Sequence, residues 1–303
     1  MTQPSAGRPH PGDLALMAVG VLGVSTSGPL IAATAAPALA VAFWRNAISI
    51  GLVGPVALAR HLREITGMGR RSRWLSVSAG ALLAAHFAFW VPSLSFTSVA
   101  SSTALVTMQA VWVAVFSRLA GHQVSARAWV GMAIAVLGVL AVTGVDLTVS
   151  AHALLGDGLA LAGGVFSGAY VVVGATVRRE VSTTAYTALC YGVTALLLLA
   201  VCLLGGVPLS GYRASDWARL AALALGAQLL GHSVFNYVLR RVSPTLVALT
   251  ILLEVPGAGL IAALFLHQVP PAATLPALAL VLGGIGLVIS ARTPEEPAPI
   301  PAE

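Results

Sequence analysis

Two charged residues of this sequence stand inside long apolar stretches, where any chemistry must proceed away from bulk water. Arg45 lies in the stretch that follows Asp13, and Glu254 lies in the stretch that follows Arg241. An ionisable side chain within a membrane is costly unless it is paired, hydrated or neutralised, so each is a candidate for a functional site. Arg45 could bind an anionic group or balance Glu254, and Glu254 could load and release a proton. The alternative is a structural Arg45–Glu254 pair, or a protonated Glu254 in a packed interface.

Pro256 follows Glu254 by two residues. Proline has no backbone N–H and weakens the helical turn before it, which frees carbonyl groups that could bind a ligand or a cation. We therefore include Pro256 in the candidate site as a helix-weakening residue.

Polar and aromatic residues in other apolar stretches complete the candidate site. His86 and His232 occupy equivalent places in the two halves of the chain, and histidine can relay protons near neutral pH. The other candidates for the substrate or coupling-ion path are Gln109, Asn236, Trp90 and Tyr191. The alternative for the histidines is a hydrogen bond between helices. For the aromatic residues it is a place in the interfacial belt of a membrane protein.

The composition excludes an ordinary water-soluble domain. Of the 303 residues, 58% are hydrophobic and only 9% are charged, and the mean hydropathy is +0.92, whereas soluble domains carry about 25% charged residues. The net charge of +6 comes from arginines in short gaps between apolar stretches and not from a basic face, so we expect no nucleic-acid partner. Cys190 and Cys202 lie in one apolar stretch and are interpreted as packing residues.

A helix needs about 20 apolar residues to cross a bilayer, and the charged residues divide the chain into about ten such spans. We place them at about 14–34, 37–58, two between Arg73 and Arg118, 127–145, 157–177, 184–205, 217–239, 244–266 and 272–291. An even number puts both termini on one side. The segments on that side hold 13 of the 16 arginines, so the positive-inside rule predicts cytoplasmic termini.

The chain also matches itself at an offset of 144–146 residues. Gly12-Asp13 corresponds to Gly156-Asp157, Gly80-Ala81 to Gly226-Ala227, and His122-Gln123 to His267-Gln268. A repeat of five spans must insert upside down in its second copy, and inverted repeats are the architecture of many secondary transporters. We predict repeats at 13–146 and 147–291, with disordered cytoplasmic tails at 1–12 and 292–303. The alternatives are a repeat kept for packing, and cleavage of a signal peptide near Ile31–Ala38.

The sequence lacks the motifs of several other classes of membrane protein. It has no phosphate-binding loop for ATP, no metal or nucleophile motif of an intramembrane hydrolase, and no channel filter. We therefore predict that the protein is not an enzyme and has no cofactor and no metal site.

Over about residues 12–291 the chain resembles the drug/metabolite transporter superfamily, in its EamA-type branch of ten helices. The resemblance depends on Phe43-Trp44-Arg45-Asn46-Ala47, the hairpin from His86 to Ser102, Leu253-Glu254-Val255-Pro256, and glycine-rich fifth and tenth spans. It implies transport of amino acids, other metabolites or drugs, often driven by an ion gradient or by exchange. The chain departs from the family at Gly121-His122-Gln123 and Leu266-His267-Gln268, where an acidic residue often stands. In the first half, Gln109 occupies the place of Glu254.

We therefore predict an all-α integral membrane protein with two inverted five-helix repeats, located in the bacterial inner membrane. Its predicted function is secondary active transport of small metabolites by alternating access. The alternative is a non-transporting membrane sensor or assembly scaffold. The expected partners are a small-molecule substrate and the lipid bilayer; protons are the candidate coupling ion, and the sequence is compatible with a homo-oligomer.

Overall fold

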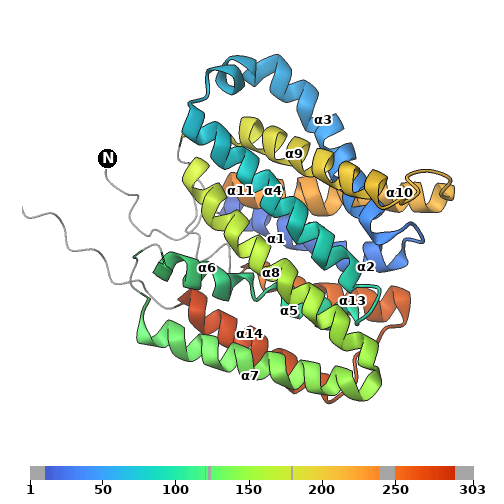
Figure 1. Ribbon diagram of the computed structural model, residues 1–303. Helices are drawn as coiled ribbons and strands as arrows, with labels where there is room; N and C mark the ends of the chain where they lie inside the picture. The colour runs from blue at the N-terminus through green and yellow to red at the C-terminus, as the bar shows by residue number, and fades with distance from the viewer. Residues whose placement is uncertain (1–10, 120, 122–123, 179, 239–249, 291–303) are drawn as a thin grey trace, which may run out of the picture.

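The computed structural model describes residues 11–119, 121, 124–178, 180–238 and 250–290, and every regular element in these ranges is a helix. This confirms the predicted all-α fold. The helices run back and forth along a common direction, so their turns gather at two opposite ends of the bundle (Figure 1). In chain order they are α1 (Pro11–Ser25), α2 (Ser27–Ala33), α3 (Ala38–Gly67), α4 (Arg70–Ser93), α5 (Val99–Val106), α6 (Gln109–Leu119), α7 (Ala126–Val149), α8 (Ala151–Val177), α9 (Thr183–Leu204), α10 (Ala214–Leu223), the π-helix η1 (Ala224–Ser233), α11 (Val234–Val238), α13 (Glu254–Leu266) and α14 (Thr274–Ser290).

Each predicted span has a helical counterpart. Seven helical segments are long and apolar enough to cross a membrane: Pro11–Ala33, Ala38–Gly67, Arg70–Ser93, Val99–Leu119, Ala126–Val149, Ala151–Val177 and Thr183–Leu204. The last three predicted spans correspond to the continuous α10–η1–α11 segment and to the shorter helices α13 and α14. The start of the ninth predicted span, at 244–249, lies outside the described residues. So do the predicted tails, apart from Pro11 and Gly12, which begin α1.

Serine residues explain where four of these helices begin. The side chains of Ser98, Ser125, Ser150 and Ser182 each accept a hydrogen bond from a backbone N–H in the first turn of α5, α7, α8 and α9. The first N–H groups of a helix have no partner within the helix, so a serine cap of this kind stabilises the start by about 1 kcal/mol. The starts of α7 and α9 lie within one residue of the predicted 127 and 184, whereas α8 starts six residues before the predicted 157.

Three of the spans are interrupted part-way along. The first breaks at Thr26 between α1 and α2, and the fourth breaks at Thr107–Met108 between α5 and α6. The ninth breaks at Leu252–Leu253, just before α13. Pro256 explains the last break: it offers no N–H to the carbonyl of Leu252, which instead accepts a hydrogen bond of 3.2 Å from Val255.

Glycines bring the helices into close contact. A Cβ atom on Gly284 of α14 would lie 2.4 Å from the backbone nitrogen of Ala135 in α7, and one on Gly23 of α1 would lie 2.7 Å from the carbonyl oxygen of Gly226 in η1. Small residues at such crossings are the usual means of helix association in membranes. Neighbouring Gly283 meets no atom within 4 Å, so only some of the glycines in these helices serve this purpose.

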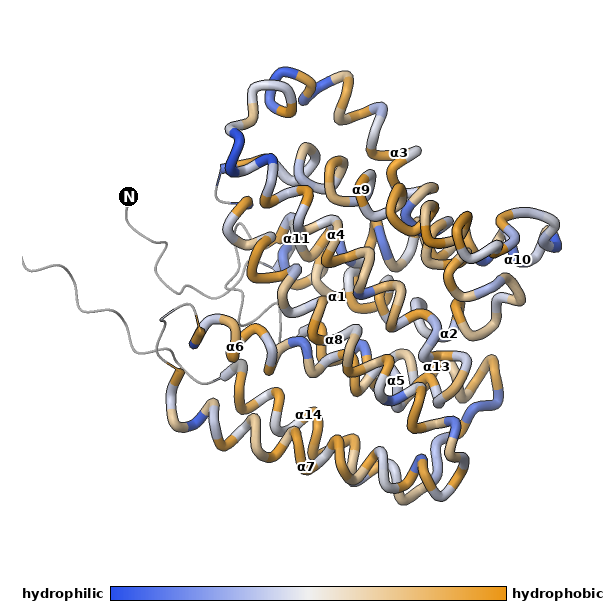
Figure 2. The backbone as a smooth tube through the Cα atoms, viewed as in Figure 1, coloured by the Kyte–Doolittle hydropathy of each residue, from blue (hydrophilic) through white to orange (hydrophobic). Residues whose placement is uncertain are grey.

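The outer surface of the bundle is apolar. Leu140 and Leu204 are 63% and 90% exposed, as a lipid-facing surface requires. Hydrophobic residues cover the lengths of the helices, whereas hydrophilic residues gather at the turn between α3 and α4 (Figure 2). We call the end with this turn the arginine end, because Arg60, Arg63 and Arg70 lie there. The turn between α2 and α3 lies at the opposite end.

Candidate functional site

Arg45 is the centre of the candidate site. It lies in α3 with no exposed surface, and its guanidinium is held by groups from three other elements. Nε donates a hydrogen bond of 2.6 Å to Oε1 of Gln228 in η1, and Nη1 donates one of 3.0 Å to Oγ of Ser27 at the start of α2. The guanidinium carbon lies 4.3 Å from the ring centroid of Phe87 in α4. Arg45 therefore joins the first, second, third and eighth helical spans.

One nitrogen of this guanidinium has no partner. Nη2 of Arg45 is buried and makes no hydrogen bond, and the same holds for Oδ1 of Asn46, the next residue along α3. A buried polar group without a partner costs about 1–3 kcal/mol, and more when it is charged. The free N–H groups of Nη2 are suited to an oxyanion, because guanidinium donors match carboxylate geometry. The arrangement can thus bind an anionic group within the protein.

Glu254 lies near Arg45 but is not paired with it. It is half-buried and is the first residue of α13, and its charge and that of Arg45 act on each other. The ion pairs that the structure describes are His61–Glu64 and Asp216–Arg219, so the two residues are more than 4.0 Å apart. The alternative of a structural Arg45–Glu254 salt bridge is therefore wrong for the described structure.

The two candidate histidines approach the same centre by different routes. His86 of α4 donates a hydrogen bond of 2.9 Å from Nδ1 to the carbonyl of Gly163 in α8, and its ring stacks on Trp90 with centroids 5.6 Å apart. This is the helix-to-helix contact that the sequence left open as an alternative. His232 lies half-buried in η1, the element that also carries Gln228.

Tyr191 and Trp90 also border this region. The hydroxyl of Tyr191 in α9 lies 3.4 Å from Oγ of Ser233, which in turn donates to the carbonyl of Gln228 at 3.3 Å. Trp90 is 3% exposed, and its Nε1 has no hydrogen-bond partner. Through Ser233, Tyr191 thus reaches the backbone of Gln228, the residue whose side chain holds Arg45.

The structure does not bring every candidate to Arg45. Gln109, the first residue of α6, accepts a hydrogen bond from Ser167 of α8, so it joins two helices away from Arg45's own partners. Pro256 is exposed at the start of α13, where it breaks the helix and does not line the centre. The side chain of Asn236 lies outside the described residues.

Sequence reasoning missed two of the partners of Arg45. Ser27 follows Ser25 and Thr26 and precedes Gly28-Pro29, and this polar group within an apolar span was the available signal for a helix break. Phe87 adjoins His86, but an aromatic residue in an apolar helix is not distinctive. Gln228 is a polar residue within an apolar stretch, yet nothing in the sequence connects it to Arg45.

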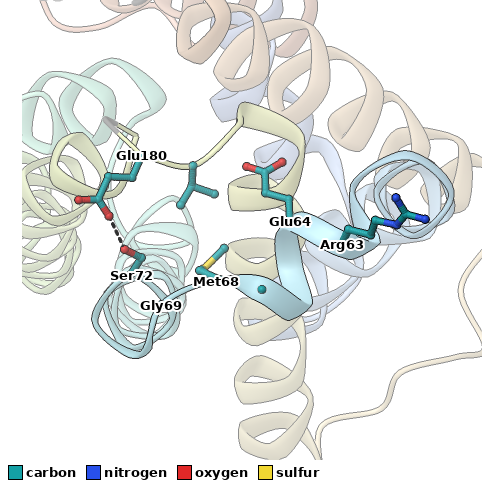
Figure 3. Close-up of a pocket in the computed structure, with 8 residues that line it drawn as sticks. Arg63, Glu64, Met68, Gly69, Ser72 and Glu180 are labelled. Carbon is teal, nitrogen blue, oxygen red and sulfur yellow. Dashed lines mark hydrogen bonds between the residues drawn. The ribbon is translucent and has the colours of Figure 1, made fainter.

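At the arginine end, the α3–α4 turn is tied to the segment between α8 and α9. Ser72 donates a hydrogen bond of 2.6 Å to Glu180, and Glu64 accepts bonds of 2.6 and 2.7 Å from the backbone and hydroxyl of Ser182. Figure 3 shows Ser72 and Glu180 joined on one side of a pocket of about 300 Å³, with Arg63 on the other side. We call these hydrogen bonds the arginine-end latch.

The opposite end has a corresponding set of contacts, which we call the opposite latch. Asp216 at the start of α10 accepts a hydrogen bond of 3.2 Å from the backbone of Ala35, and Trp44 donates one of 2.9 Å to the carbonyl of Leu209. A smaller pocket of about 100 Å³, lined partly by Val41, lies at this end. Each end of the bundle thus has a latch, and the buried Arg45 belongs to neither.

The fold and the site define a polytopic α-helical membrane protein with a buried polar centre. Residues 154–290 match the model of the EamA-like transporter family, a match that places the chain in the drug/metabolite transporter superfamily. This confirms the resemblance seen in the sequence. The family is one of membrane transporters of small molecules, which is consistent with a protein that is not an enzyme.

A solved structure named only "Crystal structure of protein" is similar in fold. It superimposes with a TM-score of 0.65, covers 93% of this chain and 98% of its own, and is 19% identical in sequence. At this identity the likeness shows the fold alone. No curated protein matches the chain.

Proposed function

We propose that this protein is a secondary active transporter that moves small carboxylate-bearing metabolites across the bacterial inner membrane by alternating access. The observation that carries the proposal is Nη2 of Arg45, a buried donor left without a partner. Carboxylate is the small anion whose two oxygens best match a guanidinium. Amino acids and related compounds meet this description, as do acidic drugs.

The inverted repeat is supported by two pairs of features. The breaks at Thr107–Met108 and Leu252–Leu253 lie 145 residues apart, so Gln109 and Glu254 each begin the helix that follows an equivalent break. Discontinuous helices in corresponding positions of two repeats mark the binding sites of many transporters. We therefore assign residues 13–146 and 147–291 to two repeats of opposite orientation.

The two latches supply the second pair. Ala35 and Glu180 are 145 residues apart, and Ser72 and Asp216 are 144 apart, so the bonds Ala35–Asp216 and Ser72–Glu180 join equivalent positions. They lie at opposite ends of the bundle, as a two-fold axis in the membrane plane requires. In alternating access one latch opens while its counterpart stays closed, and the described structure, with both closed, corresponds to an occluded state.

Glu254 is the proposed site of proton coupling. It adjoins a broken helix near Arg45 but is free of an ion pair, so a proton can join or leave it without breaking a salt bridge. His232 follows Gln228 by four residues in η1, and His86 adjoins Phe87 on α4, so both histidines lie beside partners of Arg45. We propose that protons reach Glu254 by way of this region, and that Tyr191 and Trp90 border the substrate.

The direction of insertion follows from the arginines. The arginine end faces the cytoplasm, and so do both termini. An assembly scaffold would not need a buried guanidinium with an unpartnered nitrogen, so Nη2 of Arg45 favours a protein that binds a small molecule over a scaffold.

The proposal is tested by uptake into proteoliposomes that contain the purified protein. A panel of compounds should be offered in pairs that differ by one carboxylate, such as an acid and its amide. We expect uptake of the acid to exceed that of the amide, and we expect Arg45→Gln to abolish the difference. Arg213→Gln, which removes an exposed arginine at the opposite end, is the control. Equal uptake of acid and amide by the wild type would contradict the carboxylate assignment, and no uptake of any compound would favour the scaffold.

A further inference from the structure

The arginine end carries a group of exposed cations that the proposed transport cycle does not use. Arg60 and Arg63 lie in the last turns of α3, and Arg70 and Arg71 lie in the first turn of α4. All four side chains are exposed, and the structure describes no hydrogen bond or ion pair for any of them. We call these four residues the arginine patch.

The neighbouring charged groups are already committed to other partners. Arg73 donates from Nη2 to the carbonyls of Thr66 and Met68, at 3.1 and 3.2 Å, and so closes the end of α3. Glu64 is held by Ser182 and His61, and Glu180 is held by Ser72, so neither carboxylate forms an ion pair with the patch, and two carboxylates do not balance four arginines. The patch therefore keeps its positive charge.

The patch lies at the level of lipid headgroups. With 30 residues, α3 is about 45 Å long, whereas the hydrocarbon core is about 30 Å thick, so the last ten residues extend into the headgroup layer. Exposed Leu52 and Val56 lie on the same face of α3 as Arg60 and Arg63, so a lipid-facing stripe leads directly to the cations. On α4, Trp74 is 61% exposed and lies one helical turn after Arg70, on the side toward the apolar part of the bundle. Tryptophans at membrane interfaces take this position.

From these observations we propose that the arginine patch binds the phosphate groups of anionic phospholipids. The apolar stripe of α3 and Trp74 contact the acyl chains and the interface, and the guanidiniums bind the phosphate oxygens. Lipid bound there also holds together the α3–α4 turn, which carries Glu64 and Ser72 of the arginine-end latch. This role does not depend on what the protein transports.

The test uses the purified full-length protein in detergent and native mass spectrometry with equal amounts of phosphatidylglycerol and phosphatidylcholine. The wild type should retain phosphatidylglycerol in preference. Arg70→Gln/Arg71→Gln should bind it roughly thirtyfold more weakly, since each basic residue at an anionic surface contributes about a fivefold gain in affinity. Arg118→Gln/Arg213→Gln removes the same charge from exposed arginines outside the patch and should bind phosphatidylglycerol as the wild type does.

Two further measurements keep the proposal falsifiable. The variant with all four patch residues changed to lysine should keep most of the binding, because charge is retained. Phosphatidylglycerol should also raise the melting temperature of the wild type more than that of Arg70→Gln/Arg71→Gln. Equal retention of both lipids by the wild type would overturn the proposal. Equal losses in the patch variant and the Arg118/Arg213 variant would overturn it as well, since net charge alone would then account for binding.

Discussion

Nε of Arg45 and Oε1 of Gln228 lie 2.6 Å apart, although 183 residues separate them in the sequence. This hydrogen bond joins the two halves of the chain inside the apolar part of the bundle. We expect Gln228→Leu to lower the free energy of unfolding by about 1–3 kcal/mol, because it leaves a buried charged donor unpaired. It should also weaken uptake, because the guanidinium loses its orientation.

A double-mutant cycle for each pair would show which residues support Arg45. The coupling of Arg45→Gln with Gln228→Leu should exceed the coupling of Arg45→Gln with Glu254→Gln, when both are measured by thermal unfolding in detergent. A larger coupling to Glu254 would contradict the unpaired geometry described for that residue.

Glu254→Gln should fold normally but fail in gradient-driven transport. The substitution keeps the shape and one hydrogen-bonding oxygen of the side chain, and no ion pair is broken, so expression and melting temperature should match the wild type. Uphill uptake should be lost because the side chain can no longer carry a proton. Exchange of labelled for unlabelled substrate should remain. Undiminished uphill uptake would exclude the coupling role, and failure to fold would favour a structural one.

The two latches should have opposite effects on access. Ser72→Ala removes the arginine-end bond to Glu180, so a reporter Met68→Cys should react several-fold faster with a water-soluble thiol reagent. Asp216→Ala removes the bond to Ala35, so a reporter Val41→Cys should react faster instead.

Matched controls separate opening from general loosening. Thr66→Ala loses bonds only to the carbonyls of Leu62 and Arg63 in its own helix, and Arg219→Gln leaves the Ala35–Asp216 bond in place. Neither control should change labelling. If one latch variant increased labelling at both ends, the latches would not act as alternating gates.

Two adjacent glycines in α14 should differ in their tolerance of alanine. Gly284→Ala would place a Cβ 2.4 Å from the backbone of Ala135, and backbone cannot rotate away, so we expect a loss of about 1–3 kcal/mol. Gly283→Ala meets nothing within 4 Å and should be neutral or slightly stabilising, since alanine favours the helix. Thermal unfolding of the two variants in the same detergent gives the comparison. Equal melting temperatures would mean that α7 and α14 do not pack this closely.

The orientation can be checked with reporter fusions. Fusions at residue 303 and within residues 60–73 should report the cytoplasm, and fusions at 150 and 212 should report the exterior, because most arginines then lie inside. A cytoplasmic signal at 150 would remove the inverted repeat, because an even number of spans, and not five, would then precede residue 150.

Much of the fold could be predicted from the sequence, for a physical reason that is local. In hydrocarbon every backbone group must find its partner within a helix, so an apolar stretch of about 20 residues specifies its own secondary structure. Serine caps and charged turns then set where each helix begins and ends, as Ser150 and Ser182 show. The offset of about 145 residues was also visible in the sequence, and the two residues that it relates, Gln109 and Glu254, each follow a break in the described helices.

The partners of the central residues were decided by the tertiary structure alone. Which side chain meets Arg45 depends on the rotation of each neighbouring helix about its axis and on how closely glycines let the helices approach. The sequence around Arg45 does not determine either of these. The charge on Glu254 made an Arg45–Glu254 pair a reasonable expectation, yet the fold supplies the neutral partners Gln228 and Ser27 instead. A neutral amide and a hydroxyl can hold a guanidinium without cancelling its charge, and that choice leaves Nη2 free for a ligand.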